Sequence, residues 1–327
     1  MTCALATICL NEMQWLPRLY EQHKNWPNLT KWVFVESADI MYAKSNPHLV
    51  NDRGLSVDGT TEYLSELAKR DNRIVHIPYG FCGVNSKLPL DQHKCESRNV
   101  YLDHIESIAP DLLVIIDSDE FYTHEHQKLT ADILPAFKYN NRTKKFTPHA
   151  FCFRQRHIWY PPYLQTKIGQ LRYKEYQLFT HEVIKGYWDV VHCRVWKWEK
   201  GLRYTVNHNW PSDTQGTLLV HKGSGMFRYD SRATDTRVDT KSDLPQCIHL
   251  GYAANAQHRK AKCMYYEERG EGKEPNRQLQ QRRKMYVECR NDYLSWEPGI
   301  TLTHGARVIE YQGPIPEVFK DTKNVKE

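Results

Sequence analysis

The first part of the chain alternates short apolar runs with segments whose apolar residues recur at helical spacing. The strand-like runs lie at residues 3–10, 32–35, 74–77 and 112–116, and the helix-like segments lie at 12–24, 60–70 and 91–108. Unbroken apolar runs of this length predict buried strands, and the stripe formed by Trp15, Leu16 and Leu19 is typical of a helix. Their alternation predicts an α/β fold with a mostly parallel central sheet, right-handed crossovers and helices on both faces.

The pattern changes beyond about residue 145. Residues 149–210 combine short strand-like pieces with many aromatic side chains, and 253–269 and 277–293 are helical in pattern and highly charged. The aromatics either pack the core of a mixed, β-rich region or form a platform for the apolar faces of sugar rings. We therefore expect three parts, at residues 1–145, 146–250 and 251–327.

Composition places the chain among ordinary globular proteins. Its 327 residues are 40% hydrophobic and 26% charged, which is enough for one large α/β domain or two smaller ones. No apolar stretch approaches the 18 residues of a membrane span, and the apolar start lacks a basic leader, so any membrane contact is expected to be peripheral. The nine cysteines include no Cys-x-x-Cys pair, which favours reduced thiols and a cytoplasmic location.

The net charge of +6 favours anionic partners. Such a partner could be nucleic acid, a phosphorylated small molecule or an anionic membrane surface, and the net charge alone does not choose among them. The basic clusters at 154–157 and 282–284 are equally compatible with a solvated face.

An acidic motif follows the last of the apolar runs. Asp117-Ser118-Asp119-Glu120-Phe121 comes directly after Leu112-Leu113-Val114-Ile115-Ile116. Ligands of parallel sheets bind outside the carboxyl ends of the strands, so the acids are expected at that edge. In an extended chain Asp117 and Asp119 point to the same side and can converge on a hard divalent cation that also takes phosphate oxygens. The alternative is that these acids cap the next helix or face solvent.

Five further pieces accompany this motif in a fixed order. They are Asn11-Glu12, Glu36-Ser37, Asp58-Gly59-Thr60, Glu96-Ser97-Arg98-Asn99, and Ile248-His249-Leu250-Gly251-Tyr252 followed by Lys262. With the acidic motif, this order resembles the GT-A glycosyltransferases of the family 2 type over residues 3 to 270.

The resemblance implies a Rossmann-like GT-A fold that transfers a sugar from a UDP- or GDP-sugar to a hydroxyl of a glycan or other acceptor, with inversion. It makes 1–145 the nucleotide-sugar half, 146–250 the acceptor half of the same domain, and 251–327 C-terminal helices and a tail. Asp117, Asp119 and His249 match the residues that hold a divalent metal, and mixed carboxylate and imidazole ligation suits Mn²⁺, with Mg²⁺ as the other candidate.

The resemblance also assigns groups to the nucleotide. Asn11, Glu12 and Glu36 match strand ends that surround the nucleoside, while Arg98, Asn99 and Lys262 match the diphosphate side. The ordinary alternatives are helix capping for Asn11, a solvated strand end for Glu36, a salt bridge for Arg98, an exposed position for Lys262 and a structural histidine at 249.

The sequence departs from the family pattern in two places. Residues 40–55 separate Glu36-Ser37-Ala38-Asp39 from Ser56-Val57-Asp58-Gly59-Thr60, two pieces that the family joins directly. Asn207-His208-Asn209 stands where related enzymes carry His-Glu, so Asp213 and Asp189 are the candidates for the catalytic base, with turn residues as the alternative. Glu120 is expected to order the metal loop.

Two other classes of protein fit parts of the pattern. One is another metal-dependent enzyme acting on nucleotides, a nucleotidyltransferase or phosphohydrolase, and the other is a catalytically silent glycan-binding protein. We do not expect nucleic acid among the partners, because it would not require the aromatic region or the His-Leu-Gly-Tyr element.

Overall fold

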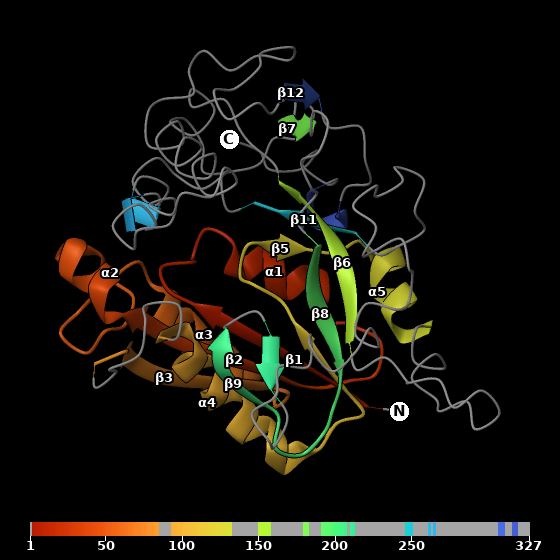
Figure 1. Ribbon diagram of the computed structural model, residues 1–327, viewed down its shortest axis with the longest axis horizontal. Helices are drawn as coiled ribbons and strands as arrows, with labels where there is room; N and C mark the ends of the chain where they lie inside the picture. The colour runs from red at the N-terminus through yellow and green to blue at the C-terminus, as the bar shows by residue number, and fades with distance from the viewer. Residues whose placement is uncertain are drawn as a thin grey trace.

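A parallel four-stranded sheet forms the N-terminal part of the molecule (Figure 1). The computed structural model describes residues 2–84, 93–132, 150–157, 179–182, 191–207, 210–212, 246–250, 261–262, 264–265, 307–310 and 316–319. The parallel strands are β1 (Cys3–Cys9), β2 (Leu29–Asp39), β3 (Ile74–Cys82) and β4 (Leu112–Ile115), in the order β3-β2-β1-β4. β2 and β3 contain the predicted runs 32–35 and 74–77, and β1 and β4 each end one residue before the predicted runs 3–10 and 112–116.

The same sheet continues into the second half of the chain. Four more strands extend it in the order β8 (Val191–Lys197), β6 (Ala150–His157), β11 (Gln246–His249) and β5 (Glu120–Phe121). β8 is antiparallel to both β4 and β6, β11 is parallel to β6, and β5 is antiparallel to β11. The predicted boundary at residue 145 lies outside the described residues, and β4 and β8 share one sheet across it.

Two small antiparallel pairs accompany the main sheet. β9 (Arg203–Asn207) pairs with β10 (Trp210–Ser212), and β7 (Phe179–Glu182) pairs with β12 (Arg307–Glu310). Two further described elements are the helix α5 (His124–Asp132) and the single-turn helix η5 (Glu317–Phe319).

Helices cover both faces of the parallel strands, which confirms the predicted α/β class. Alternate residues of a strand point to opposite faces. Trp32 and Phe34 of β2 therefore pack with α1 (Leu16–His23) and α3 (Thr60–Arg70), whereas Val33 and Val35 pack with α4 (His93–Ile108). Since β1 and β4 are buried on both sides, their sequences are almost continuously apolar rather than alternating.

The connection between β2 and α3, which contains the extra residues 40–55, is partly helical. The chain forms α2 (Ile40–Ser45) and the single-turn helix η1 (Pro47–Leu49). Asp39 caps α2, because its side chain accepts hydrogen bonds from the backbone N–H groups of Met41 and Tyr42. Six residues are too few to show a helical period, so this helix could not be predicted from the hydrophobic pattern. Similarly, the helix predicted from Glu12 begins at Leu16.

The sheet must curl to bring β5 beside β11. Five peptide steps join Ile115 of β4 to Glu120 of β5, a reach of at most about 18 Å. In sheet order, however, β8, β6 and β11 lie between these strands, which would place them about 19 Å apart in a flat sheet. Residues 116–119, which join β4 to β5, must also turn. Only a strongly curled sheet therefore allows β5 to pair with β11. This curl carries the end of β11 toward the acidic motif.

Two predictions from composition concern bilayers and thiols. None of the described helices combines the length and apolar character needed to traverse a bilayer. Cys3, Cys9, Cys82, Cys95 and Cys247 are free thiols, and all five are buried.

Candidate functional site

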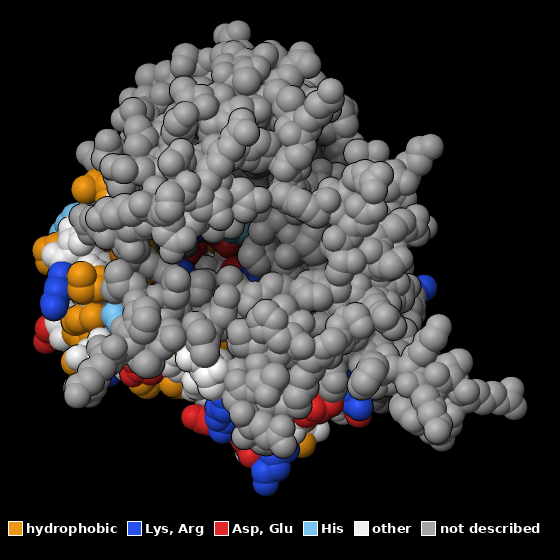
Figure 2. Space-filling model, viewed as in Figure 1, with side chains coloured by type: hydrophobic (Ala, Val, Ile, Leu, Met, Phe, Trp, Pro, Cys, Tyr) orange, Lys and Arg blue, Asp and Glu red, His pale blue; other side chains and the backbone are white. Residues whose placement is uncertain are grey.

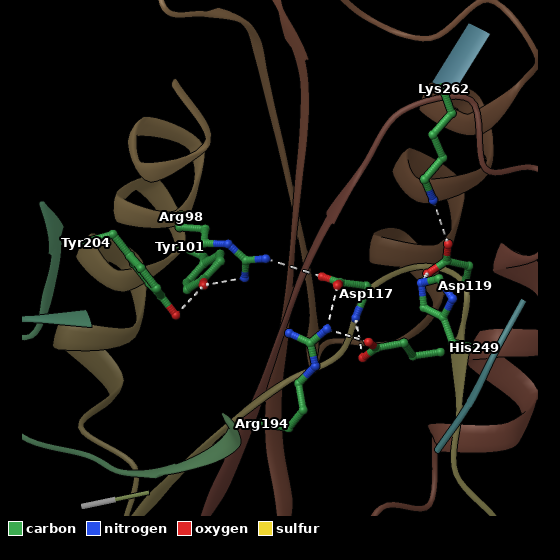
Figure 3. Close-up of polar contacts among 9 residues, drawn as sticks. Arg98, Tyr101, Asp117, Asp119, Arg194, Tyr204, His249 and Lys262 are labelled. Atoms are coloured by element: carbon green, nitrogen blue, oxygen red, sulfur yellow. Dashed lines mark hydrogen bonds and ion pairs between the residues drawn. The ribbon is translucent and has the colours of Figure 1, made fainter. Parts of the chain in front are cut away.

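The acidic motif forms a tight turn at the carboxyl edge of the sheet. The Glu120 N–H donates to the Asp117 carbonyl over 3.0 Å, and the Glu120 carboxylate accepts from the Asp117 N–H over 3.1 Å. The expectation of an extended chain, with the side chains of Asp117 and Asp119 on one side, is therefore wrong. The chain turns here because β5 must leave β4 to pair with β11. The two acids face different partners (Figure 3).

Asp117 is held by two buried arginines (Figure 3). Arg194 of β8 donates from Nη2 to Asp117 Oδ2 over 2.6 Å and also contacts the Glu120 carboxylate. Arg98 of α4 donates from Nη2 to Asp117 Oδ1 over 3.4 Å. The arginine side chains are each 4% exposed, whereas that of Asp117 is 31% exposed. Asp117 is thus the part of this charge cluster that faces outward.

Arg98 reaches the site through Asp117 rather than directly. Its Nη1 donates to the Tyr101 hydroxyl, which donates in turn to the Tyr204 hydroxyl, and its guanidinium carbon lies 5.6 Å from the centre of the Tyr204 ring. The salt-bridge alternative from the sequence therefore describes Arg98, with Asp117 as the partner. Arg98 therefore stays a candidate for diphosphate stabilisation only indirectly, through its contact with Asp117.

Asn99 connects α4 to β9. Its side-chain amide donates to the Tyr204 carbonyl over 2.9 Å and accepts from the Tyr204 N–H over 2.8 Å. This two-way exchange mimics a strand pairing, and it fixes the position of β9 on the helix that carries Arg98. Tyr204 and Trp196 are both buried, so these two aromatics belong to the core and not to an exposed sugar platform.

Asp119 faces Lys262 and His249 on the other side of the turn (Figure 3). Lys262 Nζ donates to Asp119 Oδ2 over 3.1 Å, and His249 Nε2 lies 3.5 Å from Asp119 Oδ1. Burial opposes ionisation of Asp119, but His249 and Lys262 outweigh it and lower the pKa of Asp119. Burial lowers the pKa of His249, which favours the neutral imidazole. The Leu250 N–H donates to the Asp119 carbonyl over 2.8 Å, so β11 fixes both acid and imidazole.

Glu12 is a second acid on this side. It is 8% exposed, and burial together with the nearby Asp119 raises its pKa to about 8, against the opposing charge of Lys262. The Glu12 N–H donates to Thr60 Oγ1 over 2.9 Å, which holds the strand end against α3. Lys262 therefore stands among two carboxyl groups that come from different strand ends.

Asn11 and Glu36 anchor the connection between β2 and α3. Asn11 Nδ2 donates to the Leu49 carbonyl over 2.5 Å, and Asn11 Oδ1 accepts from the Val57 N–H over 2.9 Å. Glu36 Oε1 accepts from the Ser56 N–H and Thr61 Oγ1, and its Oε2 contacts His76 Nε2 over 2.9 Å. With 0% exposure, Glu36 is not a solvated strand end. Both side chains are engaged within the protein, so their predicted contacts with a nucleoside stay a hypothesis.

The predicted metal residues fit a divalent ion in part. Carboxylate oxygen and neutral imidazole nitrogen are both good ligands for Mn²⁺, and the 3.5 Å between Asp119 Oδ1 and His249 Nε2 suits two ligands of one ion. Asp117 does not join them, because its oxygens face Arg98 and Arg194. Among the described residues, no three His, Cys, Asp or Glu side chains gather as a metal-binding group.

A hollow opens near the middle of the face seen in Figure 2, with acidic and basic side chains at its floor.

The predicted base candidates Asp189 and Asp213 lie outside the described residues, although Asp213 directly follows β10. Sequence reasoning missed Arg194. The signal was present in Val191-His192-Cys193-Arg194-Val195-Trp196, because a charged residue inside a strand-like run needs a buried partner.

Comparisons with known proteins give a weak likeness. No family model and no curated protein matches the sequence. Among solved structures, TarS 1–349 from S. aureus is similar over 90% of this chain and 72% of that chain, with 10% identity and a TM-score of 0.37. Its complex with UDP-GlcNAc is similar over 90% and 73%, with 9% identity and a TM-score of 0.34. The match to a longer TarS chain covers 48% of this chain and 22% of that one, with 14% identity and a TM-score of 0.30. Similarity at this level assigns no family and carries no functional argument.

Proposed function

We propose that this protein is a glycosyltransferase that moves a sugar from a nucleoside-diphosphate sugar to a hydroxyl of a glycan or other acceptor. The observation that carries the proposal is the placement of Asp119, His249 and Lys262 together at the carboxyl edge of the sheet. Ligands of α/β sheets bind at this edge. The mixed charge of the cluster matches a ligand that has both a diphosphate and a neutral sugar.

Departure of the diphosphate requires positive charge near the oxygens that become more negative. Lys262 is the best placed side chain for this role, because it is 26% exposed and belongs to the cluster around Asp119. Arg98 and Arg194 are too deeply buried to touch the ligand, so they act by fixing Asp117. In this proposal the accessible lysine contacts phosphate and the two arginines support the turn.

A divalent metal would be held by Asp119 and His249, with Mn²⁺ or Mg²⁺ as the candidates. When bound, such an ion neutralises phosphate charge as a Lewis acid. The chain's own contribution is to keep the imidazole neutral by burial and to fix the Asp119 backbone through Leu250. Asp117 supports this arrangement from the arginine side of the turn.

The acceptor hydroxyl needs a base, and Asp213 and Asp189 remain our candidates. Asp213 follows β10 directly, and β9 is fixed to α4 through Asn99. The hairpin thus links the neighbourhood of Asp213 to the helix that carries Arg98. Direct attack by the activated hydroxyl would invert the anomeric centre, which is the outcome we propose.

Donor turnover tests this function directly. The protein is incubated with UDP- and GDP-sugars and Mn²⁺ or Mg²⁺, and released nucleotide is measured with and without glycan acceptors. We expect release from one donor, loss of release in Asp119→Asn, and normal release in the exposed-site control Lys69→Met. Cleavage of nucleoside triphosphates in place of nucleotide-sugars would support a nucleotidyltransferase or phosphohydrolase. Glycan binding without any nucleotide release would support a silent binding protein.

A further inference from the structure

The stretch that separates the second strand from the third helix of the main fold is a built part of the site. We call residues 39–57 the 39–57 segment; it contains α2 and η1. Asn11 holds it at Leu49 and Val57, and Glu36 holds it at Ser56. The ends of two strands therefore form buried hydrogen bonds to this one connection, which is more than a simple link between strand and helix requires.

The helical stretch that carries Lys262 rests on this segment. Tyr42 of α2 and Tyr265 meet edge to face, with ring centres 5.5 Å apart and an angle of 83° between the rings. Ala261 completes this buried cluster, and Leu10 and Leu49 pack against it. Residues 261 and 265 are four apart, so one face of the helical stretch contacts α2. Lys262 follows Ala261 and reaches the neighbouring Asp119.

This apolar contact is small, and in the part of the chain that the structure describes it is separate from the two larger core clusters around the parallel strands. Tyr42, Ala261 and Tyr265 are 9%, 4% and 5% exposed, respectively. A lysine has four rotatable bonds and loses much entropy when its ammonium is held in one place. When packing already fixes the backbone beside the lysine, the loss of conformational entropy is smaller, because only the side chain itself remains to be ordered.

We propose that the 39–57 segment supports the helical stretch that carries Lys262, a support that we call the seat. Tyr42 and Tyr265 are then positioning residues that hold the Lys262 ammonium at the diphosphate-binding edge. The inference rests on the proposed function in that it takes the ligand to be a diphosphate. It adds a role for the segment by which this sequence departs from the family pattern. It also identifies two tyrosines that act on phosphate binding through another residue.

The experiment is a double-mutant cycle with inorganic pyrophosphate as the probe. Pyrophosphate affinity is measured by calorimetry, with Mn²⁺ present, for the wild type, Lys262→Met, Tyr265→Ala and the double variant. We expect Lys262→Met to weaken binding roughly tenfold or more, as the loss of one charge-assisted hydrogen bond predicts. Tyr265→Ala should weaken it several-fold, and the double variant should bind no more weakly than Lys262→Met alone.

Further variants separate seating from general damage. Tyr42→Ala attacks the contact from the other side and should reproduce the Tyr265→Ala result, whereas Tyr265→Phe keeps the ring and should bind nearly as wild type does. Tyr63→Ala is the matched control, because Tyr63 is partly buried against a different core cluster. It should lower the melting temperature without changing pyrophosphate affinity.

The outcomes distinguish the two proposals. If Tyr265→Ala and Lys262→Met weaken binding additively, the seat is refuted while the phosphate role of Lys262 stands. If Lys262→Met binds pyrophosphate as the wild type does, the diphosphate-binding role of this edge, and with it the seat, is refuted. If Tyr265→Ala does not fold, the same cycle run with Tyr42→Ala decides the question by the same criteria.

Discussion

Replacement of Arg194 by methionine should destabilise the protein through the turn that carries Asp119. Methionine keeps much of the apolar stem of arginine but removes the guanidinium. That group contacts Asp117 Oδ2 at 2.6 Å and the Glu120 carboxylate, which is 0% exposed. Arg194→Met therefore leaves one buried acid and one partly exposed acid without their shared partner.

The expected loss of unfolding free energy is about 3 kcal/mol at pH 7. Removal of one partner from a buried ion pair typically costs 3–5 kcal/mol. Burial raises the pKa of Glu120 to about 8 even against the opposing effect of Arg194, so at pH 7 Glu120 is mostly the neutral acid and leaves little uncompensated charge when the guanidinium is removed. This relief favours the lower end of the range. Asp117 is 31% exposed and is partly compensated by water and by Arg98.

The loss should grow as the pH rises. A carboxyl whose pKa is raised on folding contributes stability that is lost as the pH rises toward the folded pKa. In the wild type this loss ends near the Glu120 pKa of about 8. In Arg194→Met the pKa lies higher, so the loss continues beyond pH 8. The difference between the two proteins should be greater at pH 9 than at pH 7.

Urea denaturation followed by tryptophan fluorescence at pH 7 and pH 9 measures these differences. In thermal denaturation, the melting temperature of Arg194→Met should lie roughly 5–10 °C below that of the wild type. Arg70→Met, at an exposed position near the end of α3, is the matched control and should leave the midpoint unchanged. A deficit below about 1 kcal/mol at pH 7, or the same deficit at both pH values, would refute the reasoning.

Three other outcomes test separate parts of the site. Asp119→Asn should abolish nucleotide release and weaken Mn²⁺ binding measured by electron paramagnetic resonance, whereas Asp117→Asn should retain Mn²⁺ binding; equal loss in both would contradict their separate roles. Hydrogen bonds from neighbouring side chains and backbone outweigh burial and lower the pKa of Glu36 to about 2. Wild-type stability should therefore exceed that of Glu36→Gln above pH 4.5, and this advantage, roughly 3 kcal/mol, should vanish as the pH falls to 2 in urea titrations. Asn99→Ala should cost about 1–3 kcal/mol and accelerate amide hydrogen exchange at Tyr204; unchanged exchange would show that β9 is held by other contacts.

The strands and the helix faces could be predicted because each depends on nearby residues. Leu112-Leu113-Val114-Ile115-Ile116 is apolar at every position, as a strand covered on both sides must be. The stripe of Trp15, Leu16 and Leu19 defines the buried face of α1 in the same local way. The placement of the acids at the carboxyl edge then follows from the parallel topology alone.

Local patterns could not pair those acids with their partners, which come from distant parts of the chain; only the family resemblance had placed His249 and Lys262 near the acids. Arg194 is 77 residues from Asp117, and Lys262 is 143 residues from Asp119. No local pattern links such pairs. The turn at residues 117–120 was missed for a related reason, since the pairing of β5 with β11 decides it. The extra residues before Ser56 were recognised as a departure, but their contact with Tyr265 depends on tertiary structure.

The curl of the sheet sets an order of assembly for the acidic turn. During synthesis, β1 to β4 can associate once about 115 residues have emerged, since these four strands pair with one another in the order β3-β2-β1-β4. The turn reaches its final geometry only when β11, more than 120 residues later, pairs with β5. Contacts of such long sequence separation form late and slowly. The arrangement of Asp119 against His249 and Lys262 is therefore completed as one of the last events of folding, after the four parallel strands can already have paired.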